Sequence, residues 1–218
     1  MNTGQNLYKR AKEIIPGGNQ LLSKRPEMFL PEKWPAYYKK AKGIEVWDLD
    51  DNKYFDMTIM AIGTSSLGYA NPAVSKAVKK AIHNGCVSSL NSYEEVELTE
   101  KLIDLHPHME MARYARTGGE ANAVAVRIAR AASGKFKVAI CGYHGWHDWY
   151  LATNLDDSSN LSNLLLPGLT PSGVPKQLTE TTLPFNYGNI EELEEIINLH
   201  GNDLGVIVME VQRLKKAD

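Results

Sequence analysis

Residues 117–127 read Thr-Gly-Gly-Glu-Ala-Asn-Ala-Val-Ala-Val-Arg, and this stretch decides the fold. The alternating run before it, residues 111–116, predicts a strand, and the Ala/Val-rich run after the glycines predicts a helix. The two glycines let the backbone approach a ligand closely, and the free N–H groups and positive dipole end of the helix favour an anion. The sequence therefore predicts a phosphate site at this turn; a plain strand-to-helix connection is the alternative.

A second stretch, residues 141–148, reads Cys-Gly-Tyr-His-Gly-Trp-His-Asp and follows an apolar run at 136–140 that predicts a strand. It offers the aromatic ring of Tyr143 and the imidazole of His144. Ligands of open α/β sheets bind beyond the carboxyl ends of the strands, so we expect both stretches to face one crevice. One stretch would hold a phosphate, and the other would cover a flat ring.

Together the two stretches resemble the class III pyridoxal-phosphate-dependent aminotransferases, within the branch that includes glutamate-1-semialdehyde aminomutase. Further segments resemble that family in its order along the chain. They are Pro-Gly-Gly-Asn at 16–19, the hairpin region 41–56, Leu-Gly-Tyr-Ala-Asn-Pro at 67–72, Glu-Val-Glu-Leu-Thr-Glu at 95–100 and Val-Ile-Val-Met-Glu at 206–210. The resemblance covers essentially the whole chain.

The resemblance implies an α/β fold, the fold-type-I architecture of PLP-dependent transferases. Its large domain is a mostly parallel sheet with helices on both faces, preceded by an N-terminal arm and a small β hairpin. The alternation of strand and helix after residue 134 independently predicts a parallel sheet with crossovers. We expect the arm and hairpin at 1–70 and an incomplete cofactor-binding large domain at 71–218.

Local signals predict the individual elements. The period-two runs 45–49 and 54–57 predict a hairpin. Asn71 and Pro72 predict a helix start, and Ser92 with Glu95 forms the capping-box pattern of a second helix that Pro107 ends. The remaining predictions are a helix after Thr117 that turns Val124, Ile128 and Ala131 inward and ends at Gly134, a functional or flexible loop over 153–182, a helix capped by Asn189, and a fully buried strand at 204–211.

The resemblance also implies roles for six residues. Gly118 and Gly119 donate backbone N–H groups to the phosphate of pyridoxal phosphate, and Thr117 adds its hydroxyl. The family often has Thr or Ser where Gly119 stands, so one side-chain contact is missing here. Tyr143 stacks on the cofactor ring, and His144 lies beside it. Glu210 ends its strand near the cofactor crevice.

Two further groups of polar residues have competing interpretations. His144, His147 and Asp148 are potential metal ligands, but no additional ligand cluster accompanies them, and we predict no metal site. Residues 88, 89, 91 and 92 (Ser, Ser, Asn, Ser) lie where the family lines its substrate and dimer side, and a loop with a helix cap explains them as well.

Composition excludes several classes of protein. The chain has 218 residues, and its 24 basic and 26 acidic residues give a net charge of -2, which argues against a nucleic-acid or membrane-surface partner. No stretch resembles a signal peptide or a membrane span, so we expect a cytoplasmic protein. Cys86 and Cys141 are expected to be buried, unpaired thiols.

The function implied is transfer of an amino group from a small-molecule donor to a carbonyl compound by a homodimer. Residues after Asn19 and after Glu210 depart from the aminomutase pattern, which favours a sugar or small keto or aldehyde substrate; the aminomutase is the alternative. The family's pyridine-pairing Asp and Schiff-base lysine come after the position of Asp218, so we expect an N-terminal piece of a longer enzyme. An inactive cofactor-binding or dimerisation fragment, and a phosphate-binding enzyme unrelated to pyridoxal chemistry, remain open.

Overall fold

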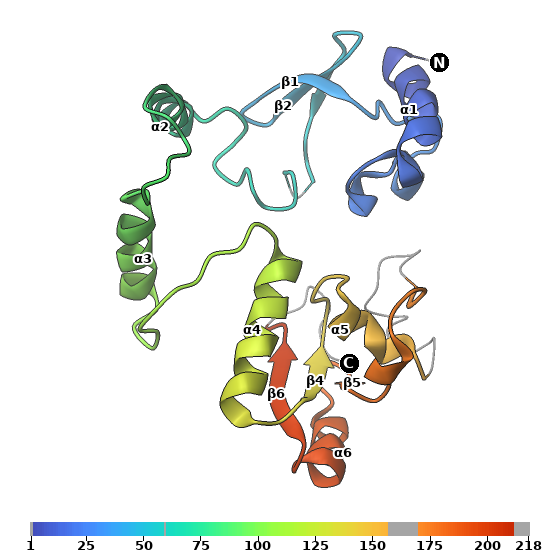
Figure 1. Cartoon of the computed structure of the whole chain (residues 1–218). Helices are drawn as coiled ribbons and strands as arrows, with labels where there is room; N and C mark the ends of the chain where they lie inside the picture. The colour runs from blue at the N-terminus through green and yellow to red at the C-terminus, as the bar shows by residue number, and fades with distance from the viewer. Residues whose placement is uncertain (1, 59, 157–169, 212–218) are drawn as a thin grey trace. The chain divides into compact units, whose positions relative to one another are not determined.

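The structure is a computed structural model that describes residues 2–58, 60–156 and 170–211. Contacts between residues divide the chain into two compact units, Met1–His108 and Met109–Asp218. Figure 1 shows the elements of both units in chain order. The domain boundary expected at residue 70 stays a prediction, and each unit is described by itself below.

The first unit begins with α1 (Thr3–Ile14), which buries Gly4, Tyr8 and Ala11. A small antiparallel sheet of order β1-β2-β3 and two further helices follow. Their bounds are β1 Tyr38–Lys42, β2 Glu45–Asp48, β3 Lys53–Phe55, α2 Pro72–His83 and α3 Glu94–Leu105. The predicted hairpin is present as β2 and β3. Strand β1 was not expected, because its three lysines interrupt the alternation of apolar and polar residues that predicts a strand.

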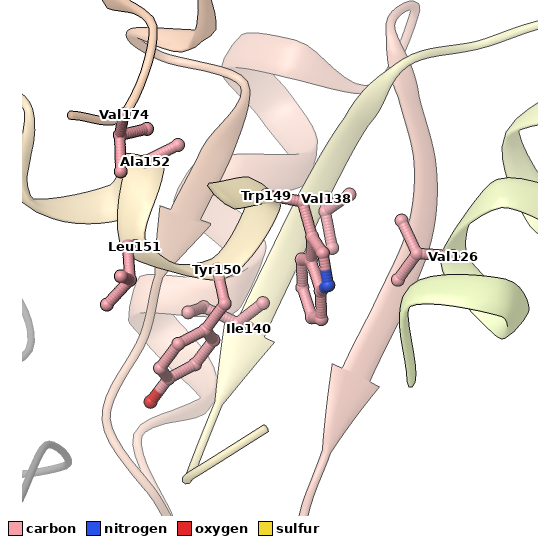
Figure 2. Packing of buried hydrophobic residues seen from close by; sticks show 8 residues of the cluster. All are labelled: Val126, Val138, Ile140, Trp149, Tyr150, Leu151, Ala152 and Val174. Carbon is pink, nitrogen blue, oxygen red and sulfur yellow. The ribbon is translucent and has the colours of Figure 1, made fainter. Parts of the chain in front are cut away.

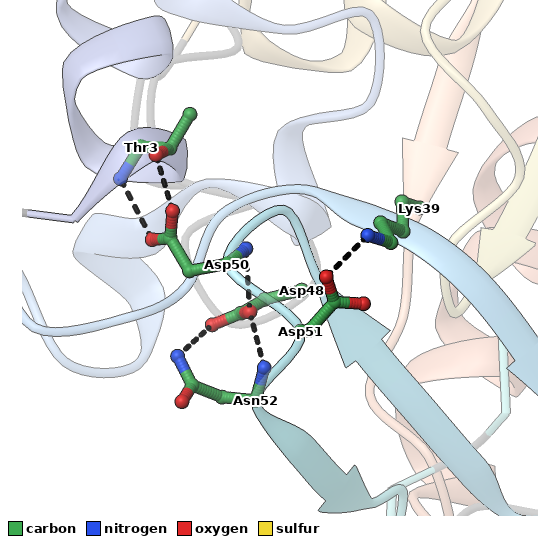
Figure 3. Close-up of polar contacts among 6 residues, drawn as sticks. All are labelled: Thr3, Lys39, Asp48, Asp50, Asp51 and Asn52. Atoms are coloured by element: carbon green, nitrogen blue, oxygen red, sulfur yellow. Dashed lines mark hydrogen bonds and ion pairs between the residues drawn. The ribbon is translucent and has the colours of Figure 1, made fainter.

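The turn between β2 and β3 is held by the buried carboxylate of Asp48 (Figure 3). This carboxylate accepts hydrogen bonds from the backbone N–H groups of Asp50 and Asn52, both at 2.9 Å, and from the Asn52 side chain at 3.1 Å. These bonds lower the pKa of Asp48 even though burial by itself raises it. The next carboxylate, Asp50, accepts from the backbone N–H of Thr3 at 2.8 Å and so ties α1 to the sheet.

Helices α2 and α3 test the capping predictions differently. Asn71 caps α2 as expected: its side chain accepts from Ala73 and Val74 N–H, and Pro72 takes the first helical position. The predicted start of the next helix at Ser92 was wrong. Helix α3 begins at Glu94 without a side-chain cap, because the Ser92 hydroxyl donates to the Glu94 carboxylate instead of accepting from the backbone.

The second unit is a parallel α/β sheet of order β5-β4-β6 with helices on both faces. The bounds are α4 Gly118–Ser133, β4 Lys137–Cys141, α5 Asp148–Leu151, β5 Thr182–Pro184, α6 Ile190–His200 and β6 Leu204–Met209. In Figure 1, β4 and β6 run side by side in the same direction, and the register of the two strands pairs Cys141 with Met209 at their carboxyl ends. The predicted parallel sheet is confirmed.

Alternation along β4 builds the core on both faces of the sheet. Val138 and Ile140 face Val126 of α4 and residues 149–152, and Figure 2 shows this packing. Ala139 and Cys141 point to the opposite face, where they pack against Phe185 and the partly buried apolar residues of α6. All four β4 residues from Val138 to Cys141 are fully enclosed. The site described below is therefore anchored on the best-packed strand of the described chain.

Several predictions about this unit were wrong. Residues 111–116 form no strand, since no other described strand pairs with them. On α4, Val126 is buried, whereas Val124, Ile128 and Ala131 are exposed, because residues two apart on a helix point to nearly opposite sides. Strand β6 is half-buried rather than fully buried because it forms an edge of the described sheet.

Other predictions hold or fall outside the described residues. Gly134 ends α4 in the left-handed conformation, and the Asn189 side chain caps α6. Cys141 is buried as expected, but Cys86 is exposed because it lies in the loop after α2 rather than in a packed element. Residues 157–169 of the predicted loop at 153–182 lie outside the described ranges. Among the residues described, no helix combines the length and apolar character that a membrane crossing requires.

Candidate functional site

The turn into α4 is a helix start with a side-chain cap. Thr117 is extended (φ -134°, ψ 156°), and its Oγ1 accepts a hydrogen bond from the backbone N–H of Glu120 at 3.2 Å. The Glu120 carboxylate in turn accepts from the N–H of Arg116 at 2.9 Å, which fixes the residue that leads into the turn. The hydroxyl of Thr117 is thus engaged in the cap, and its O–H can still donate.

The glycines supply the first N–H groups of a 16-residue helix. In the part of the chain that the structure describes, the N–H groups of Gly118 and Gly119 have no acceptor, as expected for the first turn. A Cβ at Gly118 would meet no described atom within 4 Å, so among the described residues nothing blocks a ligand there. This turn fits an anion such as a phosphate group by its free donors and by the positive end of the helix dipole.

The loop after β4 places Tyr143 at the carboxyl end of the central strand. Its side chain is 40% exposed, and its ring lies edge-to-face on buried Tyr150 with 6.0 Å between the ring centroids. The Tyr150 hydroxyl donates to Gly142 O at 3.0 Å and so fixes the start of the loop. Partial burial raises the pKa of Tyr143. The structure thus holds a neutral aromatic ring that remains open to a partner.

His144 is turned into the protein. It is buried, its Nε2 lies 2.8 Å from Cys141 O, and its ring lies edge-to-face on Tyr150 at 6.0 Å. These contacts shape the loop that presents Tyr143. A direct contact between His144 and a cofactor stays a prediction.

A contact between two glycines joins the loop to the turn. A Cβ built on Gly145, whose φ is +108°, would lie 2.9 Å from the Cα of Gly119. About one helical turn further along α4, the Asn122 side chain donates to His144 O at 3.2 Å. The structure therefore brings the two predicted stretches, 117–127 and 141–148, together.

Glu210 lies next to the same loop, one residue beyond β6. Its N–H donates to Cys141 O at 3.0 Å, and its Oε1 accepts from the N–H of Tyr143 at 3.2 Å. A Cβ on Gly142 would lie 2.6 Å from the Glu210 Cγ, so the carboxylate covers the loop backbone. The structure gives Glu210 a positioning role, and a cofactor contact stays a prediction.

Sequence reasoning missed three residues of this arrangement. Asn122 reads as an ordinary helix residue, Gly145 as a loop glycine, and His147 as a rejected metal ligand. The one signal in the sequence is the pair of glycines at 142 and 145 in the loop after β4. Such glycines often mark a close approach of the backbone, here the contact of Gly145 with Gly119. Within the described ranges, no three His, Cys, Asp or Glu side chains are arranged to hold a metal ion.

The first unit carries an apolar cavity of about 730 Å³. Aromatic residues such as Trp34, Tyr54 and Tyr69 line it, and its carboxylates, Asp48 and Asp56, already accept hydrogen bonds. None of the described residues that line it begins an α-helix. Residues 88, 89, 91 and 92 also belong to the first unit and are exposed, so their substrate role stays a prediction.

Comparison with known proteins matches this chain to one family. The profile described as Aminotransferase class-III matches residues 31–212. The chain is 33% identical over 205 residues to a 3-aminobutyryl-CoA aminotransferase of Cloacimonas acidaminovorans (strain Evry), covering 94% of this chain and 45% of that protein. It is 34% identical over 212 residues to a glutamate-1-semialdehyde 2,1-aminomutase of Methanothrix thermoacetophila, covering 96% and 46%.

Solved structures support the same fold. One described as a transaminase with PLP bound superposes with a TM-score of 0.80 at 26% identity, over 96% of this chain and 48% of that chain. The fold-type-I architecture predicted from the sequence is confirmed. The chain spans about half the length of the curated relatives it matches.

Proposed function

The chain belongs to the class-III aminotransferase family, and from this premise we propose that it forms the cofactor-binding part of an aminotransferase. The enzyme transfers an amino group from a small-molecule donor to a carbonyl compound and uses pyridoxal 5'-phosphate. The observation that carries the proposal is the close approach of Gly119 to Gly145, which brings the loop that carries the exposed ring of Tyr143 against the turn that carries the N–H donors. A phosphate joined to a flat ring needs both features at once.

Each residue of the loop and the turn has a distinct task in this proposal. The N–H groups of Gly118 and Gly119 bind the phosphate, and the Thr117 hydroxyl donates to it while its oxygen continues to cap α4. Tyr143 covers one face of the cofactor ring and excludes water from it. His144 and Glu210 hold the loop after β4 in place. His144 does so by its hydrogen bond with Cys141 O, and Glu210 by accepting from the N–H of Tyr143. The cofactor supplies the electron sink for the reaction.

The catalytic lysine is proposed to lie outside these residues. The chain spans 45% and 46% of the two relatives named above, so a longer protein has room for the Schiff-base lysine and for the Asp that pairs with the pyridine nitrogen. On this proposal, residues 1–218 alone bind the cofactor but do not transfer amino groups. The complete enzyme would be a cytoplasmic homodimer.

The substrate is proposed to be a sugar or a small keto or aldehyde compound. The relatives include both an aminotransferase and an aminomutase, so the aminomutase is kept as the second candidate. The observation that favours the aminomutase is the match with the Methanothrix thermoacetophila protein over 96% of this chain. The two candidates differ in whether the amino group leaves the molecule that donated it.

Cofactor titration tests the proposal. Purified protein is titrated with pyridoxal phosphate and with pyridoxal, which lacks the phosphate, and binding is followed by cofactor absorbance. We expect the phosphate to strengthen binding at least about tenfold, the value of one or two charge-assisted hydrogen bonds. Equal affinities for the two compounds would contradict the proposal.

Two additions separate the alternatives. Tyr143→Ala should weaken binding of both compounds, whereas the exposed Tyr38→Ala in the first unit should not; no effect of Tyr143→Ala would favour a phosphate site unrelated to pyridoxal chemistry. Borohydride reduction followed by intact mass measurement should yield a cofactor adduct on the longer protein. Absence of that adduct would favour the inactive cofactor-binding alternative.

A further inference from the structure

The imidazole of His147 carries an enclosed ring nitrogen, Nδ1. Its Nδ1 is closed off from water and has no hydrogen-bond partner among the residues that the structure describes. An enclosed polar atom without a partner is costly, and native proteins rarely keep one without a reason. The usual local solution would be to cap α5, for which His147 is the N-cap residue, but its side chain makes no such bond.

The imidazole instead points to the first turn of α4. A Cβ built on Gly119 would lie 2.8 Å from both Nδ1 and Cε1 of His147, so the ring fills the volume that a side chain at residue 119 would need. Two contacts keep it there. The ring stacks on Trp146 with 5.6 Å between centroids, and the His147 carbonyl accepts from Tyr150 and Leu151 N–H at 2.9 and 3.0 Å.

We propose that His147 is a further binding residue of the phosphate cradle: when the phosphate binds, the ring turns enough to uncover Nδ1, and Nδ1–H donates to an oxygen of the phosphate that Gly118 and Gly119 hold through their N–H groups. The inference rests on the proposed function, because it takes the turn before α4 as the phosphate site. The side-chain contact that residue 119 cannot make then comes from the loop after β4. The loop whose Tyr143 covers the cofactor ring would thus also bind the phosphate through His147.

This assignment accounts for Gly119 without reference to its backbone conformation. Gly119 lies inside α4, where glycine is a poor helix former, and its φ is not in the left-handed region. The reason for a glycine is the ring of His147. The two positions should therefore behave as one unit, so that a change at one is tolerated only with a matching change at the other.

The first test removes the donor. In the full protein, His147→Ala should weaken pyridoxal phosphate binding about tenfold and leave pyridoxal binding unchanged, since only the phosphate loses a contact. His83→Ala, on exposed α2 of the first unit, serves as the control and should change neither affinity. Melting temperatures of both variants verify that the protein is folded. Equal weakening of both compounds, or no weakening, would overturn the proposal.

The second test exchanges the two positions. Gly119→Ser alone should lower both the melting temperature and the affinity for pyridoxal phosphate, because its Cβ collides with the His147 ring. In the double variant Gly119→Ser with His147→Ala, the serine enters the vacated space and its hydroxyl replaces the lost donor, so both values should recover. Additive losses in the double variant would contradict the shared role.

The outcomes separate this inference from the proposed function. If the unaltered protein binds pyridoxal and its phosphate equally well, the proposed function fails. If the unaltered protein prefers the phosphate and His147→Ala keeps the whole preference, only the inference about His147 fails.

Discussion

The side-chain amide of Asn122 donates a hydrogen bond to the backbone carbonyl oxygen of His144 at 3.2 Å. This bond links the second turn of α4 to the loop that follows β4. Together with the close approach of Gly119 and Gly145, it holds the turn before α4 and the loop after β4 at a fixed separation. The proposed cofactor site would therefore depend on residues that need not touch the cofactor.

Asn122→Ala should detach the loop from the helix. Loss of the hydrogen bond is expected to cost about 1 kcal/mol of unfolding free energy, partly offset by about 0.5 kcal/mol because alanine is the better helix former. Asn198→Ala is the matched control, since Asn198 is an exposed residue of α6 without a hydrogen-bond partner among the described side chains. Denaturant unfolding should show the control at least as stable as the unaltered protein; equal effects of both changes would refute the link.

Gly145→Ala should disrupt the contact between the loop and α4. Its φ of +108° disfavours any side chain, and the new Cβ would lie 2.9 Å from Gly119 Cα. Gly173→Ala introduces the same kind of backbone strain at φ +87°, at a position where no described atom lies within 4 Å of the new Cβ. We expect Gly173→Ala to cost about 1 kcal/mol and Gly145→Ala about 1–3 kcal/mol more. Similar melting temperatures for the two variants would argue against the close approach.

Val126→Ala tests which face of α4 packs on the sheet. Val126 is 2% exposed within the cluster that includes Val138 and Ile140, whereas Val124 is 41% exposed. Removing the buried side-chain atoms should lower the unfolding free energy by about 2 kcal/mol, counting transfer and cavity terms. Val124→Ala should change it by less than about 0.5 kcal/mol. The reverse order would mean that the face predicted from the sequence is the packed one.

Tyr69 should make the first unit sensitive to alkaline pH. Burial and then the 2.5 Å hydrogen bond to Asp56 raise the pKa of Tyr69 to about 12. Because this pKa lies above the unfolded value of about 10, the stabilisation is complete below pH 10 and is lost as the pH rises towards 12. Tyr69→Phe should therefore be less stable than the unaltered protein at pH 8, and the gap should close above pH 10.

Unfolding measured at several pH values checks this prediction. Tyr37→Phe, which removes a hydroxyl without a hydrogen-bond partner in the described chain, should track the unaltered protein throughout. A stability gap for Tyr69→Phe that stays constant from pH 8 to 12 would show that the bond to Asp56 does not raise the tyrosine pKa.

The parts of the fold that local chemistry determines were predictable. Asn71 and Asn189 have side chains that accept from backbone N–H groups, and both cap helices as expected. Ser92 failed as a cap because a nearer carboxylate, on Glu94, took its hydroxyl. Competition between two local hydrogen bonds cannot be ranked from spacing alone.

The parts that depend on long-range packing were not predictable. The choice between Val126 and Val124 as the buried residue of α4 depends on where β4 and β6 lie, since both faces of the helix are apolar. Residues 111–116 alternate like a strand, yet a strand forms only when another strand pairs with it.

The residues of the candidate site also fall into a predictable and an unpredictable group. Gly118, Gly119 and Tyr143 could be singled out because their chemistry is visible in the sequence. The roles of Gly145 and His147 arise from a contact with Gly119 across more than 20 positions of the chain, which no local pattern reveals. The inward turn of His144 likewise follows from its packing on Tyr150.

The measurement that tests the central claim most directly is the response of the Gly118 and Gly119 amide signals in a ¹H–¹⁵N NMR spectrum. The protein is titrated first with inorganic phosphate and then with pyridoxal phosphate. If the turn before α4 holds the phosphate, both signals move with either compound, and pyridoxal without a phosphate leaves them nearly unchanged. If both signals stay in place while amides elsewhere respond to pyridoxal phosphate, the cofactor phosphate binds at another site and the account is wrong.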